Sequence, residues 1–208
     1  SGLALAAWVF LSMLSSLKER YKHKGYGSII SDFAGKGRSY WGMWLAHIGV
    51  AMFVLGATMV SNYGVEKDVR VSPGESYEME GYQFVFEGVK TIPGPNYSAH
   101  RGLFRVLRDG EEIAVLEPEK RTYLVQTRPM TEAAIDPSLT RDLYVSLGES
   151  VGGGDWAVRL YYKPFVRWIW LGAIFMGLGG LVAVSDRRYR PLARRKEAAL
   201  ESGATATA

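Results

Sequence analysis

One histidine of this chain, His47, stands inside a long apolar run, where its imidazole could ligate a metal ion or relay a proton. The run spans residues 40–60 and contains no Asp, Glu, Lys or Arg. At about 1.5 Å per residue, His47 lies about 10 Å from the start of such a helix. An ionisable side chain at that depth in a membrane is costly and marks a functional site by default. The residues alone leave three roles open: haem or metal ligation, proton relay, and a hydrogen bond to a neighbouring helix.

The helical periodicity of this run separates His47 from the residues suited to helix packing. A stripe of mostly small residues, which lets two helices approach closely, comprises Gly42, Ala46, Gly49, Phe53 and Gly56. His47 lies on another face, among Tyr40, Met43, Val50, Ala51 and Val54. Such surroundings suit an apolar cofactor such as haem, whose iron commonly takes a histidine ligand. The apolar runs contain no second histidine, so a bis-histidine site would need a ligand from elsewhere.

The remaining chemistry-bearing residues predict no catalytic group in this fragment. The absence of cysteine excludes disulfides, thiol catalysis, Cys-ligated zinc and iron–sulfur clusters. His23 lies in a basic segment and reads as a solvated charge. His100 follows Pro93-Gly94-Pro95-Asn96 and is predicted to lie in a surface loop. Trp41 and Trp44 could stack on a porphyrin, but their position predicts anchors at the membrane interface.

Three apolar segments and one polar section must position His47. They predict a multi-pass α-helical membrane protein fragment with three transmembrane helices and an inserted all-β domain, either a small sandwich or an open barrel. The chain begins with Ser1 in an apolar run without a charged n-region, so we expect it to be the C-terminal part of a longer polypeptide. The predicted division is 1–17 (transmembrane helix with a truncated start), 18–39 (cytoplasmic basic loop), 40–60 (transmembrane helix carrying His47), 61–163 (periplasmic β-rich domain), 164–184 (transmembrane helix) and 185–208 (cytoplasmic basic tail).

The distribution of the net charge of +4 along the chain indicates membrane topology and does not indicate nucleic-acid binding. Basic residues outnumber acidic ones in segments 18–39 and 185–208, which the positive-inside rule places in the cytoplasm. Three spans also put these two segments on one side, so residues 61–163 should face the periplasm of a bacterial inner membrane. The sequence therefore predicts the lipid bilayer, and no nucleic acid, as a partner.

Segment 61–163 alternates apolar and polar residues as β-strands do. The predicted strands are 68–71, 76–80, 82–89, 103–107, 122–126, 143–147 and 156–161. Turn signals separate them at Pro73-Gly74, Pro93-Gly94-Pro95-Asn96, Asp109-Gly110, Asp136-Pro137 and Gly152-Gly153-Gly154-Asp155. Asp109-Gly110, between 103–107 and 113–116, is a good hairpin candidate.

Several stretches in this order resemble the C-terminal third of the CcmF family, the large membrane subunit of the haem lyase in bacterial cytochrome c maturation, and of its close relative NrfE. These stretches are Tyr40-Trp41-Gly42-Met43 through Ala46-His47, Gly94-Pro95-Asn96-Tyr97, Pro118-Glu119-Lys120-Arg121, Met130-Thr131-Glu132-Ala133-Ala134-Ile135, Arg141-Asp142-Leu143-Tyr144-Val145 with Leu147-Gly148-Glu149, and Tyr162-Lys163-Pro164-Phe165-Val166-Arg167-Trp168-Ile169-Trp170.

The resemblance implies a role in covalent haem attachment. CcmF-like proteins receive haem as substrate from the haem chaperone CcmE and promote thioether formation with the Cys-x-x-Cys-His motif of apocytochrome c. The implied partners are CcmE, apocytochrome c, the thiol-handling subunits CcmH and CcmI, and a quinol reductant. By resemblance, His47 is an axial ligand of a membrane haem b, and the second ligand is expected upstream. The fragment alone is not expected to be catalytic; the alternative is a membrane-anchored β-domain that only docks partner proteins, with His47 merely packing.

Overall fold

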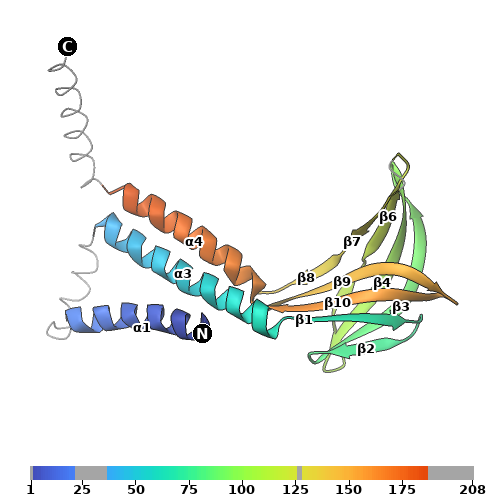
Figure 1. The fold of residues 1–208 in the computed structure, drawn as a ribbon, viewed down its shortest axis with the longest axis horizontal. Coiled ribbons are helices and arrows are strands. Elements are labelled where there is room, and N and C mark those ends of the chain that lie inside the picture. Colours follow the sequence, from blue (N-terminus) through green and yellow to red (C-terminus); the bar gives the residue numbers. More distant parts are fainter. Residues whose placement is uncertain (1, 22–36, 126–127, 187–208) are drawn as a thin grey trace, which may run out of the picture. The chain divides into compact units, whose positions relative to one another are not determined.

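The computed structural model describes residues 2–21, 37–125 and 128–186, and its chain forms two compact units. One unit comprises Ser1–Thr58 with Trp168–Ala208, and its described residues are mainly helical; the other, Met59–Arg167, is a β-domain. Most of the predicted basic loop and tail, together with His23, lies outside the described residues. The described helices are α1 (Gly2–Tyr21), α3 (Arg38–Tyr63) and α4 (Val166–Val184) (Figure 1).

Two of the three predicted spans are long and apolar enough to cross a membrane. Within the described residues, α3 with 26 residues and α4 with 19 residues meet that requirement. The apolar part of α1, Gly2–Ser16, is shorter. The helices therefore agree with the predicted segments in position, while the number of spans stays a prediction.

Close packing between α3 and α4 uses the predicted stripe of small residues. Gly42, Gly49 and Gly56 are the buried residues of α3. A Cβ built on Gly49 would lie 2.6 Å from the carbonyl oxygen of Gly172, and one built on Gly172 would lie 2.6 Å from the backbone nitrogen of Phe53. Such distances leave no room for any side chain larger than hydrogen, so glycine is what allows the two backbones to meet.

Replacing Gly172 with leucine should therefore weaken the pairing of these helices by about 1–3 kcal/mol, because the added side chain would overlap the backbone of α3. Thermal unfolding of the full-length protein in detergent would measure this as a lower midpoint. Gly180→Leu on the same helix is the matched control, since a Cβ there meets nothing within 4 Å. Equal midpoints for the two variants would contradict the packing argument.

The β-domain is a sandwich, which decides between the two predicted architectures. The order of its four-stranded sheet is β1-β10-β9-β8, and that of its six-stranded sheet is β2-β3-β4-β6-β7 with β5 paired to β4. All strand pairs are antiparallel. The strands are β1 (Val65–Val71), β2 (Ser76–Met79), β3 (Tyr82–Pro93), β4 (Tyr97–Arg108), β5 (Glu111–Leu116), β6 (Glu119–Tyr123), β7 (Pro129–Glu132), β8 (Ala134–Pro137), β9 (Arg141–Gly152) and β10 (Asp155–Pro164).

The core of the sandwich lies between the inward-facing apolar residues of the two sheets. Phe86 and Phe104 of the six-stranded sheet stack with ring centroids 4.8 Å apart. From the other sheet, Leu143, Val145 and Leu147 alternate along β9 and are fully buried. This alternation is the period-two pattern that predicted strands from the sequence.

Two hairpin turns have the backbone that the sequence chemistry favours. Asp109 and Gly110 join β4 to β5 with φ of 54° and 83°, which confirms the predicted hairpin. Glu80 and Gly81 form a second turn of this kind, with φ of 51° and 75°. Both residues of such a turn need positive φ, which is easiest when the second is glycine.

Three local predictions were wrong. His100 lies in β4, paired with Lys120 of β6, and not in a loop. Asp136 and Pro137 belong to β8 and do not form a turn. The predicted strand bounds 82–89, 103–107 and 122–126 were also wrong, because β3 ends at Pro93, β4 begins at Tyr97 and β6 ends at Tyr123. Pairing between strands determined these ends, and the local sequence pattern did not.

Candidate functional site

His47 lies exposed on α3 with one ring nitrogen already bonded. Its Nδ1 lies 2.7 Å from the carbonyl oxygen of Met43, one turn earlier. Because a carbonyl can only accept, Nδ1 carries the proton and donates it. This bond uses Nδ1 and leaves Nε2 as the ring nitrogen that could ligate a metal ion, with its lone pair, in the Nδ1–H tautomer.

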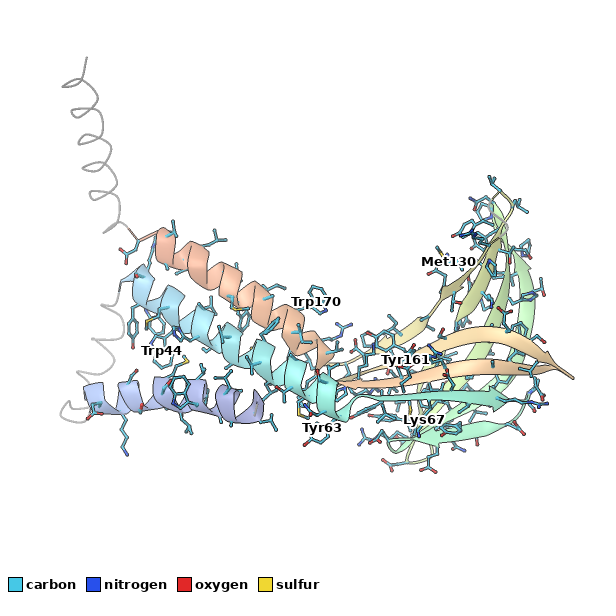
Figure 2. All side chains as sticks on the ribbon, in the orientation of Figure 1. Trp44, Tyr63, Lys67, Met130, Tyr161 and Trp170 are labelled. Carbon is cyan, nitrogen blue, oxygen red and sulfur yellow. The ribbon has the colours of Figure 1, made fainter. Side chains whose placement is uncertain are left out.

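A cavity of about 210 Å³ adjoins this imidazole. Its walls come from α1 and α3, and Trp44, labelled in Figure 2, is one of the α3 residues that line it. The hydroxyls of Ser12 and Ser16 donate to carbonyl oxygens of their own helix, at 2.8 and 3.1 Å. No charged residue belongs to the lining, which comprises Ser12, Met13, Ser16, Met43, Trp44 and His47.

The donor set of this cavity fits one side of a haem site. A neutral imidazole with a free Nε2 is an axial ligand for haem iron, and the surrounding methionine and tryptophan side chains suit an apolar macrocycle. The volume is below the roughly 300–1,000 Å³ of enclosed ligand sites. In a haem site, these two helices would supply one wall and one axial ligand. A second, almost wholly apolar cavity of about 310 Å³ is lined by residues of α1 and α3, among them Phe10 and Met52, and by Trp168 of α4.

The sequence predicts the same role for Trp41 and Trp44, whereas the structure places only one of them at the cavity. Trp44 lines the cavity beside His47. Trp41 is 41% exposed and is not part of that lining.

His100 in the β-domain lies 3.2 Å from the hydroxyl of Thr91, and its ring centroid is 5.5 Å from that of Trp156. Among the described residues, no group of three or more His, Asp or Glu side chains could hold a metal ion.

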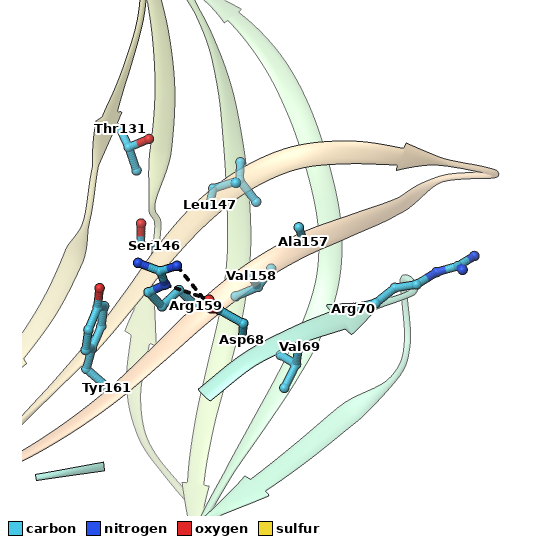
Figure 3. Close-up of a pocket in the computed structure, with 11 residues that line it drawn as sticks. Asp68, Val69, Arg70, Thr131, Ser146, Leu147, Ala157, Val158, Arg159 and Tyr161 are labelled. Carbon is cyan, nitrogen blue, oxygen red and sulfur yellow. Dashed lines mark hydrogen bonds and ion pairs between the residues drawn. The ribbon is translucent and has the colours of Figure 1, made fainter. Parts of the chain in front are cut away.

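A trough of about 520 Å³ crosses the four-stranded sheet of the β-domain (Figure 3). Residues of β1, β9 and β10 line it, with Thr131 of β7 at one side. A Cβ on Gly148 would lie 2.8 Å from the carbonyl oxygen of Ala157, so backbone forms part of its floor. Arg159 donates to both oxygens of Asp68 at 2.5 and 3.0 Å. These bonds hold the pKa of the Asp68 carboxyl below its usual range. The carboxylate of Asp68 thus balances the positive charge of Arg159. A trough with balanced charges is better suited to bind a polar protein surface than to bind an anion.

The stretch Pro118-Glu119-Lys120-Arg121 contains a buried charge cluster to which the sequence assigned no role. Glu119 is only 6% exposed and accepts from Arg121 and Arg101, each at 2.7 Å. Arg121, then Arg101, lowers the pKa of the Glu119 carboxyl against the opposing effect of burial. Lys120 pairs with Glu149 of β9, which joins the two sheets. The only sequence signal for this cluster is the alternation of charged residues in a predicted strand. That pattern usually indicates a solvent-exposed face, so it does not predict burial.

Known proteins are similar both to the β-domain and to most of the chain. The family model described as the CcmF C-terminal beta-sandwich matches residues 62–164. The chain is 52% identical over 186 residues to the cytochrome c-type biogenesis protein CcmF of Pseudomonas fluorescens, covering 89% of this chain and 28% of that protein. It is 40% identical over 152 residues to the cytochrome c-type biogenesis protein NrfE of Haemophilus influenzae, covering 73% and 24%.

A solved structure of the cytochrome c heme lyase CcmF superposes with a TM-score of 0.68 at 19% identity, covering 88% of this chain and 30% of that chain. That likeness shows a shared fold. The chain spans less than a third of the length of each of these relatives. With the matched sandwich and the sequence identity together, the chain belongs to the CcmF family and corresponds to its C-terminal part.

Proposed function

We propose that this chain is the membrane-anchored C-terminal part of a haem lyase subunit, which assists covalent attachment of haem to apocytochrome c. Relatives that are up to 52% identical over 186 residues are named cytochrome c-type biogenesis proteins, and a structure of the same fold is named a heme lyase. Thioether formation needs haem, a reduced Cys-x-x-Cys-His motif and a scaffold that holds both. The chain supplies part of that scaffold.

The observation that carries the cofactor proposal is the bonded state of His47. Its Nδ1 donates to Met43, so Nε2 is available as an axial ligand of a haem b within the membrane. The Met43 carbonyl orients the ring, and the side chains of Met13 and Trp44 give the adjoining cavity apolar surface. Haem bound there would supply a one-electron couple, which suits reduction of substrate haem iron by a quinol. The second axial ligand would come from residues beyond this chain.

The topology we propose has three spans, with α1 crossing beside α3 and α4. The positive-inside rule places segments 18–39 and 185–208 in the cytoplasm of a bacterial inner membrane. Residues 61–163 would then face the periplasm. This is the compartment in which a haem chaperone and an apocytochrome could meet the β-domain.

A docking role for the β-sandwich is the second function that an observation favours. The trough of about 520 Å³ offers hydroxyls and balanced charges on the four-stranded sheet. Such a surface suits a protein partner; candidates are CcmE, apocytochrome c and the thiol-handling subunits CcmH and CcmI. Docking and haem ligation are compatible, because different units of the chain would perform them.

Deleting the gene from its host and restoring it on a plasmid tests the proposed function. Loss of the gene should abolish haem that stays attached to c-type cytochromes after denaturing electrophoresis, because only thioether-linked haem survives that treatment. Plasmid-borne full-length protein should restore it. Covalent haem at wild-type levels in the deletion strain would show that the protein is not needed for attachment.

A further inference from the structure

The two tryptophans of α3 differ in their position relative to His47. At 100° per residue, Trp44 lies about 60° from His47 around the helix and Trp41 lies about 120° away. In agreement with this, Trp44 lines the cavity at His47 and Trp41 does not. The indole of Trp44 thus occupies the same face as the candidate ligand, one turn before it.

The neighbours of Trp44 hold an apolar ring in place. The ring of Tyr40 lies 6.2 Å from that of Trp44 in a tilted arrangement, one helical turn earlier. Across the cavity, Met13 of α1 is 8% exposed and its thioether contributes a soft apolar surface. A flat indole braced on one side and facing a cavity on the other is suited to contact a planar ligand.

We propose that Trp44 forms the aromatic wall of the haem site at His47 and determines how firmly haem is held and at what potential its iron is reduced. The inference rests on the proposed role of His47 as a ligand. The apolar shell around a metal site controls solvent access and the local dielectric. A dry site disfavours the additional positive charge of ferric iron, so removing the indole should admit water and favour the ferric state.

The test uses the full-length protein purified in detergent, as wild type, Trp44→Ala, Trp44→Phe and Trp41→Ala. Three quantities are measured: the visible spectrum, the rate of haem transfer to excess apomyoglobin, and the midpoint potential by equilibrium titration. Trp44→Ala should keep its six-coordinate bands, lose haem about tenfold faster, and show a lower potential. Trp44→Phe should recover part of both changes, because it restores a flat apolar ring. Trp41→Ala should match the wild type.

The inference is overturned if Trp44→Ala retains haem and potential as the wild type does, or if Trp41→Ala changes them equally. Should Trp44→Ala fail to fold, Trp44→Phe carries the test, and a wild-type haem loss rate together with a wild-type potential in Trp44→Phe would overturn the inference. A His47→Ala variant separates this failure from failure of the proposed function. Unchanged bands in His47→Ala would show that His47 is not a ligand, which contradicts the proposed function of this site. Lost bands in His47→Ala, together with wild-type behaviour of the Trp44 variants, would contradict only the role of Trp44.

Discussion

Replacing His47 with alanine should remove the six-coordinate haem b bands from the visible spectrum of the full-length protein. The imidazole is held by one bond from Nδ1 to the Met43 carbonyl, and no other described residue of the cavity offers a nitrogen ligand. Loss of an axial ligand changes the spin state and coordination of the iron. The Soret and α bands should shift or vanish at unchanged protein yield.

His100→Ala is the matched control for this prediction. His100 is also exposed, but it belongs to β4 of the sandwich and already contacts Thr91 and Trp156. Its variant should keep the wild-type spectrum. Adding imidazole to a His47→Gly variant should restore the bands, since a free ligand can enter the space that the side chain leaves. Identical spectra for wild type and His47→Ala would mean that His47 is a packing residue and that the chain reduces to an anchored docking domain.

Replacing Glu119 with alanine should lower the free energy of unfolding of the β-sandwich by about 2–3 kcal/mol. The carboxylate accepts from two guanidiniums at 2.7 Å and is 6% exposed. Its removal leaves Arg101 and Arg121 without their shared acceptor. Both are partly exposed and can recover some hydration, so the loss stays below the full cost of stranding a buried charge. Hydrogen exchange of peptides from β4 and β6, in the full-length protein, would measure the change.

The same carboxylate predicts a pH response. Its pKa is lowered in the folded state, so its stabilising contribution is present above the ordinary value of about 4.3 and is lost as pH falls below it. Exchange protection, corrected for the intrinsic rate at each pH, should fall less steeply in Glu119→Gln. Glu117→Ala is the control, because Glu117 is half exposed and makes one contact at 3.2 Å to Arg101; it should cost under about 1 kcal/mol. Equal losses for the two alanine variants would show that burial of Glu119 is unimportant.

The sequence by itself determined the features that repeat with a regular period. Continuous apolar runs of membrane length predicted α3 and α4, because backbone groups in lipid must bond within a helix. The spacing of Gly42, Gly49 and Gly56 predicted the packing face of α3, since residues at this spacing fall on one side of a helix. Alternation along β9 and the dipeptide Asp109-Gly110 predicted strands and a hairpin for equally local reasons. His47 stood out because an ionisable residue is costly in an apolar run.

Only the tertiary structure decided which residues meet across elements. Whether the β-domain forms a sandwich or an open barrel depends on pairing between strands that are distant in the sequence. The short strands β7 and β8 show little of the local alternation that predicts a strand. Helix geometry places Trp44 nearer to His47 than Trp41, but only the position of α1, which brings Met13 to that face, forms the cavity there. Burial of Glu119 requires Arg101 from β4, 18 residues away. These contacts depend on the path of the backbone through space, and sequence periodicity describes only one element at a time.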